Sequence, residues 1–124
     1  MKLPEVVGLT LCERFEINQG IASLVGVFQG LHFAAFPTPV KQFVAYSGLS
    51  GKSLEGTMEL TVTRLAGEKD LFSLKRWLSF PGHVITINLL VPVTCVFPAP
   101  GSYSISLRFH NEVLTQRILE IFAD

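Results

Sequence analysis

The feature that most constrains the fold is a repeated alternation of apolar and polar side chains with a period of two residues. It is clearest from Tyr103 to Phe109, where aromatic and aliphatic residues occupy every second position and Ser or Arg lies between them. Successive side chains of a β-strand point to opposite faces of its sheet, so this pattern is typical of an antiparallel strand with one buried face. Residues 57–63 and 85–89 alternate in the same way.

Other segments are almost continuously apolar, which predicts strands that are buried more completely. They comprise residues 6–12, 21–28 and 43–46. Turns rich in Gly, Pro, Ser and Asn separate the apolar segments at short and even spacing, which is typical of a sandwich or barrel. The 124 residues suffice for one core. We therefore predict one all-β domain over residues 1–124, an antiparallel β-sandwich of the immunoglobulin-like or jelly-roll-like kind.

Two segments allow a second interpretation. In Asp70–Phe80, the spacing of Leu71, Leu74 and Leu78 also fits a helix. We favour a strand there, because it would complete a hairpin with residues 57–65. The last apolar segment, Val113–Phe122, mixes both periods, and a C-terminal helix is the alternative to a strand.

Composition excludes several classes of protein. Apolar residues make up 48% of the chain and charged residues 16%, the opposite of a disordered chain. Ten basic residues balance ten acidic ones, so nothing favours binding to nucleic acid or to an anionic membrane. No apolar stretch approaches the length of about 20 residues that spans a bilayer. Because residues 1–5 do not resemble a secretory signal, we expect a cytoplasmic protein with free thiols. A Cys12–Cys95 disulfide is the alternative.

Known catalytic and metal-binding motifs do not match the sequence. Gly51-Lys52-Ser53 resembles the end of a phosphate-binding loop, but Tyr46 replaces the glycine required five positions earlier. His32, His83 and His110 have no metal-ligand spacing, and neither cysteine belongs to a C-x-x-C pair. We expect no catalytic residues, no metal and no cofactor.

One segment has a composition that is frequent at protein interfaces. Trp77 lies beside Arg76, and Phe72 precedes them on the same segment. Trp and Arg are enriched among the residues that dominate interface energetics. We take Phe72, Arg76 and Trp77 as a hypothetical protein-contact patch.

The landmarks of the chain resemble those of a family of small, uncharacterised bacterial proteins known only as a domain of unknown function. They are Cys12, the stretch from Asn18 to Phe28, Phe36-Pro37, Phe97 to Tyr103, and a final hairpin around Glu112 to Leu114. The resemblance implies an antiparallel β-sandwich and implies no activity. In the segment 97–103 the prolines stiffen the approach to a strand, and the Tyr103 ring is expected to be buried with its hydroxyl reaching backbone.

We expect a non-catalytic interaction module that self-associates or binds a protein, such as a homo-oligomer or a subunit of a larger bacterial assembly. Two alternatives stay open. One is a module for a small ligand, a carbohydrate or lipid, that would use exposed aromatic residues such as Trp77 and Tyr46. The other is an enzyme with a site built from scattered residues around His32 or His83.

Overall fold

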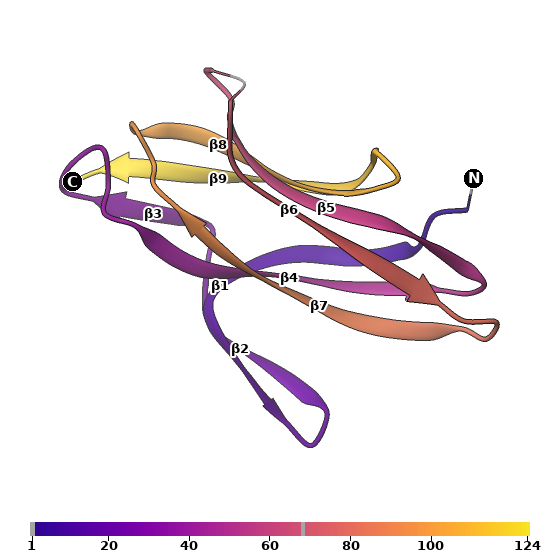
Figure 1. The fold of residues 1–124 in the computed structure, drawn as a ribbon. Helices are drawn as coiled ribbons and strands as arrows, with labels where there is room; N and C mark the ends of the chain where they lie inside the picture. Colours follow the sequence, from indigo (N-terminus) through magenta and orange to yellow (C-terminus); the bar gives the residue numbers. More distant parts are fainter. Residues whose placement is uncertain (1, 68) are drawn as a thin grey trace.

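The computed structural model describes residues 2–67 and 69–124; Met1 and Glu68 lie outside the described part. The described residues form nine strands in two sheets that pack face to face (Figure 1). The strands are β1 (Glu5–Asn18), β2 (Ile21–Phe28), β3 (Gly30–Phe33), β4 (Lys41–Gly51), β5 (Leu54–Arg64), β6 (Asp70–Phe80), β7 (Ile85–Cys95), β8 (Gly101–Phe109) and β9 (Glu112–Ala123). The all-β prediction is therefore confirmed.

The first sheet has the strand order β2-β1-β4-β7, and the second has the order β3-β9-β8-β5-β6. Neighbouring strands run antiparallel with one exception. The exception is β3, whose residues 30–33 pair in parallel with residues 120–123 of β9. Strands from the first third of the chain thus lie in both sheets.

The core lies between the sheets and follows the period of two. On β5, Met58, Leu60 and Val62 are buried, and their cross-strand partners on β8 are Phe109, Leu107 and Ile105, which are buried as well. The inward side chains of β4, β7 and β9 complete one apolar cluster. Burial of this apolar surface, at about 25 cal/mol per Å², is the main force that holds the two sheets together.

The turn before β8 has the expected form. The Tyr103 ring is fully buried and packs edge-to-face on Phe97, with ring centroids 5.0 Å apart. Its hydroxyl donates a hydrogen bond of 2.6 Å to the carbonyl of Ala99. Gly101 adopts a φ of +138°, a conformation that only glycine takes without strain. The expected burial of the Tyr103 ring, with its hydroxyl bonded to backbone, is confirmed.

Both ambiguous segments are strands. Asp70–Phe80 forms β6 and pairs with β5 along its length, so the preference for a strand is confirmed. The helical alternative for the C-terminal segment is wrong, because Leu119 and Ile121 of β9 are buried two residues apart on one face of the sheet. Among the described residues, no helix is long and apolar enough to cross a membrane.

The Arg117 side chain links the two sheets by a hydrogen bond to the backbone of β1. β1 has an irregularity between Val7 and Thr10, where Gly8 adopts a φ of +63°. Two carbonyls there lie outside the regular ladder. The Ser47 hydroxyl donates to the carbonyl of Gly8 and the Arg117 guanidinium of β9 donates to the carbonyl of Leu9, each at 2.7 Å. Arg117 therefore links the second sheet to the bulge of the first.

The substitution Arg117→Met tests this link. It keeps most of the apolar stem but removes the donor, so the Leu9 carbonyl loses a charge-assisted hydrogen bond. We expect the free energy of unfolding in urea to fall by about 1–3 kcal/mol. The control is Arg14→Met, because Arg14 only pairs with Glu16 on the surface, where both side chains are 61% exposed. Equal stability of the two variants would contradict this role of Arg117.

Candidate interaction surface

The outer half of the β1–β2 hairpin projects from the two packed sheets (Figure 1). We call residues 13–27 the arm. β2 pairs with β1 on one side, and no described strand pairs with its other edge. A two-stranded hairpin without further support is marginally stable in water. The arm is therefore the part of the fold that most needs cover.

The arm exposes large apolar side chains on both of its faces. Ile17 is 60% exposed and lies on the face that continues from buried Leu11. Ile21 is 68% exposed and Val27 55%; both lie on the opposite face, where they pair with Asn18 and Cys12. Single exposed apolar residues are common on protein surfaces, whereas these three lie on one projecting element, one on its first face and two on its second.

The base of the arm is held by specific contacts. The Lys41 ammonium at the start of β4 lies 2.7 and 3.0 Å from the two carboxylate oxygens of Glu13. Opposite Glu13 stands Gly26, with a φ of +72°, and a Cβ atom there would lie 2.8 Å from Cγ of Glu13. Phe28 packs edge-to-face on Phe43 at 5.5 Å between centroids. These contacts position the arm relative to the first sheet.

A shallow hollow of about 310 Å³ lies beside the base of the arm. Phe15 of the arm lines it together with Phe43 and Val44 of β4 and with Pro92 and Val93 of β7. Glu13, Arg14, Gln42 and Thr94 also line it, so the hollow beside the arm has a mixed apolar and polar lining.

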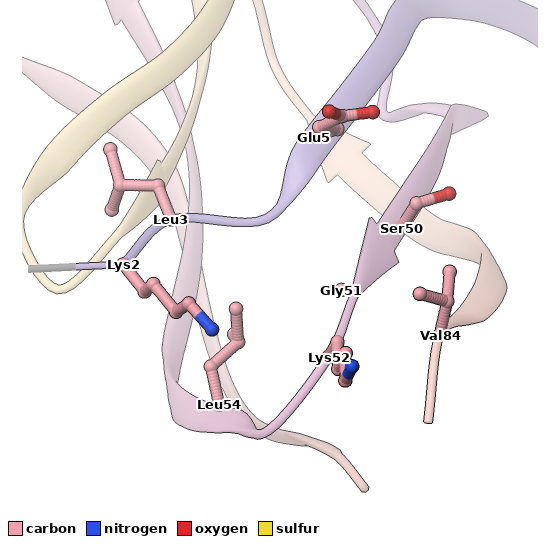
Figure 2. Close-up of a pocket in the computed structure, with 8 residues that line it drawn as sticks. All are labelled: Lys2, Leu3, Glu5, Ser50, Gly51, Lys52, Leu54 and Val84. Atoms are coloured by element: carbon pink, nitrogen blue, oxygen red, sulfur yellow. The ribbon is translucent and has the colours of Figure 1, made fainter. Parts of the chain in front are cut away.

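A second hollow, of about 350 Å³, lies at the turn between β4 and β5 (Figure 2). Lys2 and Leu3 of the N-terminal segment, Lys52 of the turn and Leu54 lie around it. Lys52 and Ser53 form the turn between β4, which ends at Gly51, and β5, so a strand follows where a phosphate-binding loop requires a helix.

The structure divides the predicted contact patch between two faces of β6. Trp77 pairs with Thr57 on the outer face and is 60% exposed. Arg76 lies in register with fully buried Met58, on the side of the sheet that faces the core, although its own side chain is exposed. Phe72 is half-buried and packs against the core. These three residues therefore do not form one surface.

The prediction that Ile21–Phe28 is a more completely buried strand is wrong. Ile21 and Val27 are among the most exposed apolar residues of the described chain. A strand that is apolar on both faces belongs in an interior, and the pattern detected that property correctly. The pattern could not show that the described chain leaves Ile21 and Val27 exposed.

Residues 8–122 match the model of a family of unknown function, DUF6941. The chain belongs to this family. Among curated proteins, none matches it. The resemblance noted in the sequence is thereby confirmed, and the DUF6941 family model covers the arm, both sheets and the final hairpin.

The titratable groups of this DUF6941 chain are dispersed. The His32 ring stacks on Phe122 at 4.8 Å between centroids, and Nε2 of His110 lies 2.9 Å from the carbonyl of Glu55. In residues 2–67 and 69–124, no three His, Cys, Asp or Glu side chains come together as a metal site would require.

Both cysteines are free and buried. β4 separates them, because Cys12 pairs with Val44 on one side of β4 and Cys95 pairs with Lys41 on the other. Two strand spacings amount to roughly 10 Å, more than a disulfide spans. Burial raises the pKa of the Cys95 thiol from 9.0 to about 11, and burial is also the largest cause of the raised pKa of Cys12. Neither thiol has the lowered pKa of a reactive nucleophile.

The raised thiol pKa predicts a loss of stability in alkali. The folded state keeps Cys95 protonated, whereas the unfolded chain releases the proton above the ordinary pKa of 9.0. The contribution of the Cys95 thiol to the free energy of unfolding is fully present below pH 9.0 and is lost as the pH rises toward 11. We expect the free energy of unfolding to fall by about 2–3 kcal/mol over this interval.

Urea unfolding of the wild type and Cys95→Ala, measured from pH 8 to 11, checks this expectation. At pH 8 the variant should have a lower free energy of unfolding than the wild type. Its free energy of unfolding should fall less between pH 8 and pH 11. A thiol reagent should label neither cysteine in the native protein at neutral pH and both in urea. Parallel pH curves for the two proteins, or rapid labelling of the native state, would show that the Cys95 thiol is not shielded.

Proposed function

We propose that this DUF6941 chain is a non-catalytic interaction module that binds a protein surface through the arm. The observation that carries this proposal is the exposure of Ile17, Ile21 and Val27 on two faces of one projecting hairpin. Binding that covers these side chains removes apolar surface from water and adds support to a hairpin that is marginal alone.

The charge distribution supports a protein partner. The chain has no net charge, and the arm pairs its own charges: Arg14 with Glu16, and Glu13 with Lys41. What the arm offers a partner is therefore mainly apolar side chains and the free backbone edge of β2. Such a surface suits another folded protein better than a polyanion.

Several finer expectations belong to the same proposal. They are a single domain over residues 1–124, an immunoglobulin-like or jelly-roll-like sandwich, a cytoplasmic and bacterial setting, and membership of a homo-oligomer or a larger assembly. The two packed sheets are compatible with a single domain and with a sandwich. The parallel β3–β9 pair distinguishes the second sheet from a purely antiparallel sheet.

A double substitution on the arm tests the proposal. Ile17→Ser/Ile21→Ser removes two exposed apolar side chains, so stability should change by no more than about 0.5 kcal/mol per site. The matched control is Val7→Ser/Val84→Ser, because those side chains are 70% and 67% exposed outside the arm. Tagged proteins are captured from a lysate of the source organism, and the mass of each eluted complex is measured by light scattering.

We expect the wild type and the control to elute in a complex of defined stoichiometry, with themselves or with another protein, and the arm variant to elute as a monomer. Identical complexes for the arm variant and the control would refute the role of the arm. A monomeric wild type that captures no protein would refute the proposed function.

A small-ligand module is the second candidate, and the exposure of Trp77 on the outer face of β6 favours it. Trp77 is the single tryptophan of the chain, so tryptophan fluorescence, excited at a wavelength that the two tyrosines do not absorb, reports on this surface alone. A saturable change of its emission on titration with sugars would support the second candidate. We expect none, because the arm and β6 lie at opposite ends of the two sheets.

A further inference from the structure

The four edge strands of the described sheets differ in how well they could accept another strand. β7 contains Pro92, which removes one amide donor, and β3 has only four residues. β6 carries Lys75 and Arg76 side by side. Proline, short length and charge are the usual devices that keep an edge strand from pairing with another chain.

β2 lacks proline, charge and short length, and its backbone irregularity at Gly26, with a φ of +72°, lies beyond the segment 21–25. It has eight residues, IASLVGVF, and contains no charge and no proline. Its outer edge therefore offers backbone donors and acceptors without an electrostatic barrier, and exposed apolar side chains flank it on both faces. Edge strands of this kind recruit a further strand through main-chain hydrogen bonds.

We propose that the occupant of this edge is β2 of a second copy of the chain, paired antiparallel about a two-fold axis. This inference rests on the proposed function, because it uses the same arm. Two-fold pairing places a strand against itself, so a charged strand such as β6 would bring its like charges together, whereas uncharged β2 does not. The neutral net charge of the chain adds no long-range repulsion between copies.

Pairing of two arms also completes the arm itself. The order β1-β2 followed by β2-β1 of the partner subunit makes a four-stranded sheet, and sheets of three or more strands with an apolar face are stable where a hairpin is not. With Ser23 near the axis, Ile21 and Val25 stay on one face and Ala22 and Leu24 on the other, because antiparallel pairing preserves the alternation. The interface is small, so we expect roughly micromolar affinity.

Sedimentation equilibrium of the full chain between about 1 and 100 µM, the range around that affinity, tests the inference. Ser23→Lys and Ser23→Glu each place a like charge beside its symmetry mate without removing a core residue. Each should raise the dissociation constant of the dimer about tenfold or more. An equal mixture of the two variants should regain wild-type association. The control is Ser79→Lys on the β6 edge, because Ser79 is also an exposed serine on an edge strand, and it should dimerise as the wild type does.

Hydrogen exchange gives a second readout, since the β2 amides that do not pair with β1 should slow as the wild type is concentrated. A wild type that is monomeric at every concentration, or a Ser23→Lys dimer as tight as the wild type, would overturn the inference. If the chain is monomeric but captures a different protein in an arm-dependent way, the inference fails and the proposed function stands. If no complex depends on the arm, both fail.

Discussion

Burial of one apolar face from each sheet is the interaction on which the rest of the structure depends. The paired strands β5 and β8 carry the densest part of it, with Met58, Leu60 and Val62 set against Phe109, Leu107 and Ile105 in register. Once these faces are matched, the register of each neighbouring strand is constrained, because a slip of one residue would turn its apolar side chains to water. Directional contacts such as Tyr103 to Ala99 and Arg117 to Leu9 then select one geometry among those that burial allows.

Most of the fold could be predicted from alternation and turn residues. Tyr103–Phe109 and Thr57–Thr63 alternate strictly, and the structure pairs these two segments directly. β6 was more difficult to predict, because Leu71, Leu74 and Leu78 fit a helix as well as a strand. Pairing with β5 stabilises the strand, and the periodicity of the sequence holds no information about this pairing. The parallel β3–β9 pair had no local signal, since it joins segments about ninety positions apart in the sequence.

The candidate surface was less accessible to sequence reasoning than the fold. Trp77 drew attention because its composition is typical of interfaces, yet strand alternation separates it from Phe72 and Arg76. The exposure of the arm was not predicted for the opposite reason: residues 21–28 are almost continuously apolar, a composition that predicts burial within the same chain. A pattern describes what a side chain needs from its surroundings, and only the three-dimensional arrangement shows whether its own chain supplies this. For Ile21 and Val27 it does not.

The place of β9 between β3 and β8 has a consequence for biosynthesis. β3 pairs with residues that follow it by about ninety positions, so it has no described partner strand until residues 120–123 have been synthesised. During that time β1 and β2 can already pair, because their turn is local. The nascent chain thus exposes its uncharged edge strand β2 before Leu119 and Ile121 of β9 complete the core.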